Sequence, residues 1–373
     1  MKTVLAVPLL ALAMAAAQAP RAELAPAKVA RIGQVMTAFM ARNKVPGLSV
    51  AVVADGEMAW SDGYGLADVE NQVPAKATTV YRTASIGKTM TATAAMFLVE
   101  ERKLSLDDEV QKYCPAFPRK DYRLTSRHLL SHLAGVRHYG GPRDEEEQSS
   151  NVHYANVVDA LAPFKDDPLL FRPGTKFLYS TYGYNVLGCV IQGAAGVPFL
   201  EYMKRAVWDR AGMSSTRDDD PAAIIPNRAA GYAIVGGELR NARKIDMSSK
   251  MPAGGYVTTV GDLAKFSIAL MQGRLVRPET FRLMTTPTAL DDGTKVPFGI
   301  GWPLELEEWH SDNWISHGGS TPGVSGMLAL MPRHRFAVAI LANVEELPDR
   351  SELAADVARI ALGLGEPITS KAP

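Results

Sequence analysis

The sequence predicts an α+β protein in which an antiparallel β-sheet is flanked by terminal helices and joined to an inserted, mostly helical domain. Three observations lead to this prediction. Strand-like apolar runs occur near both ends of the 373-residue chain, a long middle region carries helical and loop signals, and a strongly apolar helix begins near residue 85, where the two regions meet. Strands at the two ends need partners, so we expect them to pair in one sheet.

The N-terminal elements follow from periodicity and turn signals. Residues 26–43 carry apolar side chains at helical spacing and predict an amphipathic helix. Residues 48–53 predict a strand, and residues 57–61 predict the returning strand after an Asp-Gly turn. The next helix, at about 85–103, is apolar on nearly every side, so we expect it to be buried.

The C-terminal elements complete the predicted sheet. A helix is predicted from about Val260. The apolar runs 324–331 and 336–341, which a Pro-Arg-His segment separates, predict a β-hairpin. Residues 351–362 predict a closing helix. We therefore expect the hairpin to join the N-terminal strands, with helices from both chain ends beside the sheet.

These elements divide the chain into two predicted domains. Residues 26–103 and 241–366 would form a discontinuous α/β domain, and residues 104–240 would form the helical domain inserted into it. The acidic run 144–147 predicts a solvated loop, and a lid over the site is the alternative. A pocket is expected where the two domains meet.

The charge balance and the N-terminal segment indicate which partners and which cellular location to expect. Lys+Arg and Asp+Glu number 40 each, which gives no reason to expect nucleic acid or an acidic membrane surface as partner. Residues 1–17 predict a signal peptide, because Lys2 precedes an apolar stretch that is too short to span a bilayer and ends in small residues. We expect cleavage before Gln18 and a periplasmic or secreted protein without a later membrane span; an uncleaved anchor is the alternative.

The cysteines and histidines leave two questions of pairing. Cys114 and Cys189 are compatible with a disulfide in an exported protein or with two buried free thiols. His128 and His132 are spaced i, i+4 and would share one helix face, as in some metal sites. No Glu follows His128 in the metalloprotease pattern and no third ligand is evident, so we predict no metal.

The apolar helix carries the strongest candidate for chemistry. Ser85 and Lys88 are three residues apart, and no other lysine has a serine three residues before it. On the first turn of a helix, the two side chains would lie side by side. A desolvated lysine loses its charge and can take the serine proton. The alternative is an N-capping serine followed by a helix-forming lysine.

Two later stretches could complete a site. Tyr179 is predicted on a loop that enters a helix. A nearby Lys88 ammonium would favour the phenolate form of its side chain, so Tyr179 could act as base together with Lys88. Thr181 would hydrogen-bond substrate or Lys88. The second of these stretches, residues 316–323, contains His317 among glycines and precedes an apolar strand. A substrate backbone could approach an edge strand closely there.

Three motifs in this order resemble those of the serine β-lactamase and penicillin-binding-protein superfamily. They are Ser85-Ile86-Gly87-Lys88, Tyr179-Ser180-Thr181 and His317-Gly318-Gly319. The tyrosine in the second motif points to the class C branch, which includes carboxypeptidases, esterases and D-amino-acid peptidases. The resemblance covers roughly residues 30–365.

The resemblance implies acyl transfer through an ester on Ser85. Lys88 and Tyr179 would activate Ser85 and return its proton, and the backbone N–H groups of Ser85 and Ser320 would form the oxyanion hole. His317, together with Gly318 and Gly319, would line the substrate site beside Ser320. No cofactor is implied.

Two departures from the family pattern bear on the substrate. Thr181 stands where the second motif usually ends in Asn, and His317 stands where true β-lactamases usually have Lys. The Tyr-Ser-Thr motif is similar to that of mitochondrial β-lactamase-like peptidases. We therefore expect a peptidase or esterase acting on a small peptide, ester or β-lactam. If His317 meets a substrate carboxylate, binding should strengthen as pH falls through the histidine range. The alternatives are a true class C β-lactamase and a non-catalytic module that binds peptidoglycan or peptide.

Overall fold

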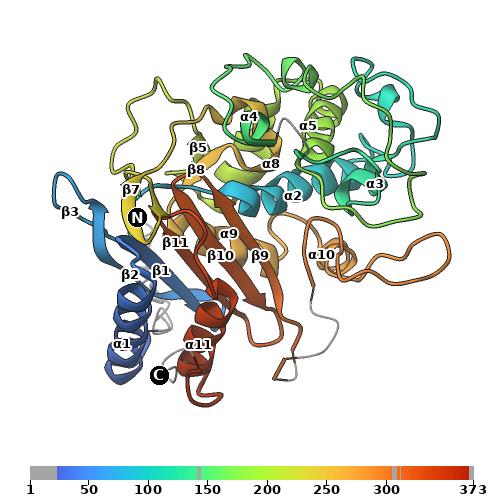
Figure 1. The fold of residues 1–373 in the computed structure, drawn as a ribbon. Helices are drawn as coiled ribbons and strands as arrows, with labels where there is room; N and C mark the ends of the chain where they lie inside the picture. Colours follow the sequence, from blue (N-terminus) through green and yellow to red (C-terminus); the bar gives the residue numbers. More distant parts are fainter. Residues whose placement is uncertain (1–22, 141–143, 305–308, 311, 369–373) are drawn as a thin grey trace, which may run out of the picture.

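The computed structural model describes residues 23–140, 144–304, 309–310 and 312–368. The predicted signal peptide, residues 1–17, lies outside them. The described elements form one six-stranded antiparallel sheet with helices on both faces and a largely helical region beyond one face (Figure 1). The predicted α+β class, with a sheet built from both chain ends, is therefore confirmed.

The sheet has the strand order β3-β2-β1-β11-β10-β9. From one edge to the other, its strands are β3 (Val73–Pro74), β2 (Glu57–Asp68), β1 (Gly47–Ala54), β11 (Phe336–Ala342), β10 (Val324–Met331) and β9 (Ile315–Thr321). The N-terminal β1 pairs with the C-terminal β11, with Val50 opposite Ile340. β10 and β11 are buried along their whole lengths, as central strands covered on both faces are. β9 is an edge strand.

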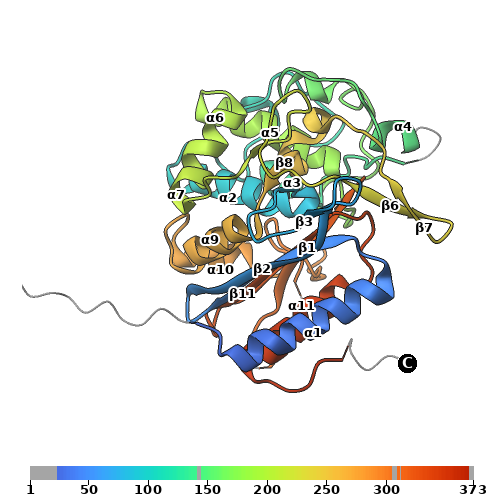
Figure 2. The same cartoon turned by 90° about the vertical axis from the view of Figure 1, so that its left-hand side faces the viewer.

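Helices α1 (Pro26–Asn43) and α11 (Arg350–Leu362) pack together on one face of the sheet, below it in Figure 2. The apolar positions that predicted α1 are those it buries, at i, i+3, i+4 and i+7: Ile32, Val35, Met36 and Phe39. Lys44, in a left-handed conformation, ends the helix. The two terminal helices thus close one side of the molecule.

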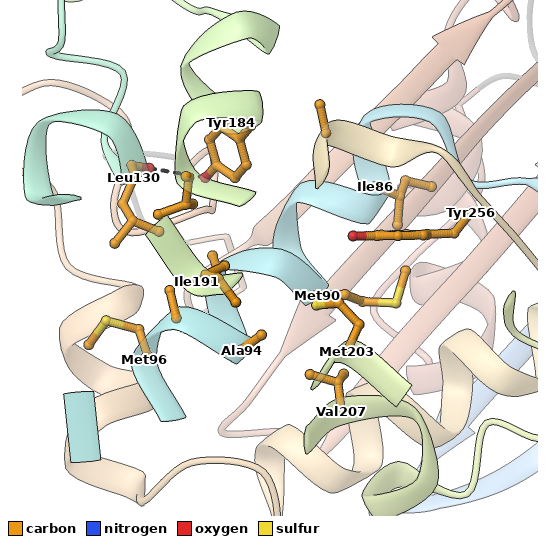
Figure 3. Close-up of a cluster of buried hydrophobic side chains, with 14 of the residues drawn as sticks. Ile86, Met90, Ala94, Met96, Leu130, Tyr184, Ile191, Met203, Val207 and Tyr256 are labelled. Carbon is orange, nitrogen blue, oxygen red and sulfur yellow. Dashed lines mark hydrogen bonds between the residues drawn. The ribbon is translucent and has the colours of Figure 1, made fainter. Parts of the chain in front are cut away.

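Helices α2 (Gly87–Glu100) and α9 (Val260–Met271) lie on the opposite side of the sheet from α1 and α11 (Figure 2). α9 packs on β1, β2 and β11, whereas α2 packs on α5 (Thr181–Ala195) and α8 (Met251–Gly254). Met90, Ala94 and Met96 of α2 stand in an apolar cluster with side chains of its neighbours (Figure 3). The expectation that the helix after Ser85 is buried all round is therefore confirmed.

The remaining helices and strands are short. They are α3 (Ser126–Leu130), α4 (Asp144–Gln148), α6 (Phe199–Met203), α7 (Asp209–Ala211), α10 (Pro278–Met284), β4 (Tyr81–Arg82), β5 (Arg217–Asp218), β6 (Tyr232–Val235), β7 (Glu238–Asn241), β8 (Tyr256–Thr258) and the single turns η1 (Ala84–Ile86), η2 (Val110–Lys112), η4 (Asp159–Leu161), η5 (Lys204–Trp208) and η6 (Met247–Lys250). Helices α3 to α7 fall within residues 104–240, the predicted helical domain. The short strands β5 and β6 also fall there, so this region is not purely helical. The predicted limits of the two domains stay predictions.

The structure corrects two local expectations. The acidic run 144–147 is not a loop but most of α4, where Glu147 is a bidentate partner of the half-buried Arg137 and is thereby removed from solvent. His128 and His132 do not share a helix face, because α3 ends at Leu130 and His132 has a φ of 58°. Within the described ranges, no group of three His, Cys, Asp or Glu residues is arranged to hold a metal ion.

The cysteine question is answered by a disulfide between Cys114 and Cys189. It ties α5 to the loop after η2, and both residues are buried. In the described part of the chain, no single helix has the length and apolar character needed to cross a membrane; α5 with Phe199–Ala211 meets those criteria only as a pair bent by 78°.

Candidate active site

Ser85 lies in η1, the single turn directly before α2, and not at a helix cap. No side-chain capping bond is formed at the start of η1 or of α2, which excludes the N-cap alternative. Ala84 has a φ of 45°, a conformation that non-glycine residues rarely adopt. Gly254 lies against the same turn so closely that a Cβ there would approach the Ala84 carbonyl oxygen to 1.8 Å. The turn that presents Ser85 is therefore strained and is held by the segment before β8.

Lys88 is only 1% exposed, and its amine has three close polar neighbours. The Nζ atom lies 3.1 Å from Ser85 Oγ, 3.3 Å from Thr181 Oγ1 and 3.2 Å from the Ala253 carbonyl oxygen. Burial, with a smaller contribution from the positive charge of Lys250, lowers the pKa of Lys88 to about 7. A neutral amine has two N–H groups for the threonine and the carbonyl, and its lone pair then faces Ser85.

Tyr179 precedes Ser180, the N-cap of α5, and shares a side-chain hydrogen bond with Ser85. Its ring lies 4.9 Å below the Lys88 amine and 4.3 Å from the ring of His132. Burial raises the pKa of Tyr179, so the expected shift towards phenolate is wrong. The physical reason is that the cost of burying a charged phenolate outweighs the hydrogen bond with Ser85 and the positive charge of Arg350, both of which favour the phenolate. The phenol keeps its proton and can donate it.

Thr181 is the first residue of α5, and its hydroxyl meets the amine of Lys88. Its backbone N–H donates to Nδ1 of His138 at 3.2 Å, and the neighbouring Ser180 hydroxyl donates to the Arg137 carbonyl at 2.7 Å. Of the two roles expected for Thr181, the described contacts therefore favour holding the lysine. No sequence motif had singled out His138.

The third motif reaches the nucleophile through β9. A Cβ on Gly319 would lie 2.7 Å from the Thr83 carbonyl oxygen and 3.1 Å from the Ser85 nitrogen, so glycine allows the edge strand to pass directly beside the nucleophile. Ser320 is opposite Ser325 of β10, and its hydroxyl accepts a 3.3 Å hydrogen bond from the Glu346 N–H. Its backbone N–H as second oxyanion donor stays a prediction.

His317 is buried, and its protonation state follows from its contacts. Nδ1 lies 2.7 Å from the Gly318 carbonyl oxygen, which can only accept, so Nδ1 carries the proton. Burial, then the charge of Lys88, lowers the pKa of His317 to about 3. The expected titration in the ordinary histidine range is therefore wrong. Nε2 is a buried acceptor without a partner among the described residues.

Arg350 is a neighbour of the site that the sequence reasoning missed. A Cβ on Gly318 would lie 2.7 Å from its Nε, so the guanidinium flanks the strand that carries His317. Arg350 is the first residue of α11 and acts electrostatically on both Tyr179 and His317. The packing of α11 on β10 and β11 brings it there, and no local pattern in the sequence signals it.

Comparisons with known proteins identify the family and the fold of the chain. The Beta-lactamase family profile matches residues 32–362. The mitochondrial serine beta-lactamase-like protein LACTB of Mus musculus is 31% identical, over 79% of this chain and 71% of its own length. The octameric penicillin-binding protein homologue from Pyrococcus abyssi superposes with a TM-score of 0.78 and 27% identity, covering 92% of this chain and 78% of that one. The D-amino acid amidase from Ochrobactrum anthropi SV3 has the same fold, with a TM-score of 0.76 at 21% identity over 91% of this chain and 100% of that one.

Proposed function

The chain belongs to the Beta-lactamase family, and on this premise we propose that it is an exported serine hydrolase that cleaves a peptide, amide or ester bond through an acyl-enzyme on Ser85. The observation that carries the proposal is the Lys88 amine, buried, 3.1 Å from the Ser85 hydroxyl and with its pKa lowered to about 7. A base with a pKa near the working pH is well matched to removing the serine proton.

In the acylation step, Ser85 Oγ attacks the substrate carbonyl carbon while Lys88 takes the hydroxyl proton. Negative charge develops on the carbonyl oxygen and would be met by the backbone N–H groups of Ser85 and Ser320. The carbon–nitrogen or carbon–oxygen bond to the leaving group then breaks. The phenol of Tyr179 gives its proton to the leaving atom and regains one from the Lys88 ammonium, so the protons balance.

Deacylation follows the same path in reverse. A water molecule takes the position of the leaving group and attacks the ester carbon, and Lys88 again removes the proton. Ser85 Oγ leaves as the ester bond breaks, and it recovers a proton through Tyr179 or Lys88. The product acid is released and the site returns to its starting protonation state.

For the substrate, we propose a peptide or small ester over a β-lactam. A lysine at the head of the third motif would offer a permanent cation, whereas His317 stays neutral with an acceptor at Nε2. Thr181 is engaged with Lys88 and has fewer polar atoms than Asn for a substrate amide. Beyond Ile315, which also bridges to Leu304, the edge strand β9 pairs with β10 alone among the described strands, and its outer side suits an extended peptide.

The proposed export has one structural support. The disulfide between Cys114 and Cys189 is of a kind that persists in oxidising compartments such as the periplasm. Expression of the full chain in a bacterium, followed by fractionation and N-terminal sequencing, tests this point. A periplasmic protein beginning at Gln18 supports the proposal, and a cytoplasmic protein with an intact N-terminus contradicts it.

The catalytic proposal is tested on the purified mature protein. A fluorophosphonate probe should label it, and peptide mapping should place the adduct on Ser85. Nitrocefin, p-nitrophenyl acetate and aminoacyl anilides are then compared from pH 5.5 to pH 8, and ester or anilide cleavage should be the faster. Nitrocefin turnover above about 10 s⁻¹, with the others near background, would identify a true β-lactamase. A protein that takes up no label would be a binding module.

A further inference from the structure

His132 is a buried histidine for which the mechanism above has no role. It is 1% exposed and follows the end of α3 with a φ of 58°, a conformation that few non-glycine residues adopt. Its Nε2 atom is buried without a hydrogen-bond partner among the described residues. Both features cost free energy, so a histidine kept in this place calls for an explanation.

The contacts of His132 fall on three successive residues, Leu178, Tyr179 and Ser180. Its backbone carbonyl accepts a 2.9 Å hydrogen bond from the Leu178 N–H, and its Nδ1 atom accepts a 3.1 Å hydrogen bond from the Ser180 N–H. Between these two bonds, its ring packs on that of Tyr179, with 4.3 Å between the centroids and 36° between the planes. One residue therefore holds the tyrosine by its ring and by the backbone on either side of it.

The hydrogen bond to Ser180 also defines the protonation state of His132. Since a backbone N–H can only donate, Nδ1 is an acceptor, and the proton of the neutral ring is on Nε2. Burial lowers the pKa of His132, so the ring stays uncharged near neutral pH and the acceptor is kept. The imidazole thus gives the backbone at the start of α5 a fixed hydrogen-bond partner.

Among the aromatic rings around Tyr179 in the described part of the chain, that of His132 is the nearest. The ring centroids of His138 and His317 lie 5.8 and 6.4 Å from that of Tyr179, against 4.3 Å for His132. The phenol shares a hydrogen bond with Ser85, so a displaced ring would carry the hydroxyl away from the reacting atoms. An error of about 1 Å in the place of a reacting group can cost about 10²-fold in rate.

We propose that His132 is a positioning residue for proton donation, which holds the phenol of Tyr179 in the place from which it gives its proton to the leaving group. The inference rests on the proposed function, since it requires Tyr179 to act as that donor. It assigns the orientation of the donor to a residue in the loop after α3, outside the three motifs.

The test uses the leaving group to isolate the donor. The amine of an aminoacyl anilide must take up a proton as its carbon–nitrogen bond breaks, whereas p-nitrophenyl acetate releases a stabilised phenolate that needs none. The values of kcat/KM for the two substrates are compared in the mature protein. If the wild type cleaves no anilide, an alkyl acetate takes its place, because the departing alkoxide needs the same proton.

His132→Phe keeps a ring at this position but has no acceptor for the Ser180 N–H. Its kcat/KM should fall about 10- to 100-fold for the anilide and less than about threefold for p-nitrophenyl acetate. Tyr179→Phe should likewise slow the anilide more than the ester. In the Tyr179→Phe background, the change at His132 should add little further loss, because the donor it positions is already absent.

His132→Asn is the conservative variant. Its side-chain oxygen can take the place of Nδ1, and asparagine tolerates a positive φ, so it should recover part of the anilide rate that His132→Phe loses. A thermal melt shows whether each variant folds. If His132→Phe does not fold, His132→Asn carries the test and should still slow the anilide more than the ester, because it lacks the stacked ring.

The chain offers a matched control in His128. Its Nδ1 atom also accepts a backbone N–H, that of Thr125 at 3.3 Å, at the start of α3 and not at the second motif. His128→Phe removes the same kind of hydrogen bond. The ratio of its anilide and ester rates should match that of the wild type.

The outcomes separate the two proposals. If the His132 variants slow the anilide and the ester by one factor, or if their loss is undiminished in the Tyr179→Phe background, His132 has only a structural role and the inference is wrong. If Tyr179→Phe itself slows both substrates alike, or if a fluorophosphonate leaves no adduct on Ser85, the proposed function fails.

Discussion

Two sides of the candidate site differ in how many of their polar atoms have hydrogen-bond partners. We call the side built by Ser85 and Lys88 the η1–α2 flank, and the side built by residues 315–321 the β9 flank. On the η1–α2 flank, the Lys88 amine has three polar neighbours within 3.3 Å, and Ser85 contacts both Lys88 and Tyr179. On the β9 flank, Nε2 of His317 is buried without a partner among the described residues. An unpaired buried polar atom is costly, and such sites in native proteins often await a ligand or water.

The difference separates chemistry from recognition. A proton-transfer step needs fixed distances, and the η1–α2 flank provides them before any substrate arrives. Recognition depends on groups that find a partner only when the substrate binds, and the β9 flank presents an acceptor at His317 beside the cation Arg350. We therefore expect changes on the first flank to abolish turnover and changes on the second to alter preference.

The largest effect is expected for Ser85→Ala. Removal of the nucleophile should reduce hydrolysis by about 10³-fold or more, because no ester can form. The thermal midpoint should stay close to that of the wild type, since Ser85 is only partly buried. Steady-state kinetics and a thermal melt check both points. Residual activity within tenfold of wild type would mean that the nucleophile lies elsewhere.

The next largest effects are expected for Lys88→Ala and Tyr179→Phe. Each should lower kcat/KM by about 10²- to 10⁴-fold, because one removes the base and the other the proton donor of the same step. The double variant should lose much less than the product of the two factors. The measurement is kcat/KM for all four members of the cycle. Full additivity of the two free-energy losses would show that the residues act independently.

The close approach of β9 to the turn that carries Ser85 is tested by Gly319→Ala. The new Cβ would press on the Thr83 carbonyl and the Ser85 nitrogen, so the turn that presents the nucleophile must move. We expect kcat to fall about 10- to 100-fold. Gly318→Ala is the matched control, since its Cβ meets the end of the flexible Arg350 side chain, and it should affect KM more than kcat. Equal losses of kcat in both variants would contradict this account.

The smallest effect concerns the pH dependence of recognition. Since the pKa of His317 is lowered to about 3, this residue gains a proton only in strong acid and adds no charge between pH 8 and pH 5.5. Inhibition constants of a carboxylate-bearing competitor should therefore vary with pH to the same extent in wild type and in His317→Gln. Any variation that both proteins share belongs to other groups such as Lys88. If the pH dependence of the inhibition constant disappears only in His317→Gln, His317 does carry a charge in this pH range and the prediction is wrong.

Much of the fold follows from local signals in the sequence. The helical periodicity of residues 26–43 corresponds to α1, because side chains at that spacing share one face. The continuous apolar runs 324–331 and 336–341 correspond to the β10–β11 hairpin, because central strands are buried on both faces. The i, i+3 spacing likewise anticipated that Lys88 would lie beside Ser85. These features depend on neighbours in the chain, which a sequence displays directly.

Charge states, pairing and distant neighbours depended on the tertiary structure. The proton of Tyr179 and the neutrality of His317 follow from burial, which no pattern of neighbouring letters reveals. Cys114 and Cys189 are paired because α5 packs beside the loop after η2. Arg350 approaches the site from α11, far along the chain from Ser85. The sequence by itself determined which groups could carry out acyl transfer, and the packing around them decided which hold protons, because desolvation acts through space and not along the chain.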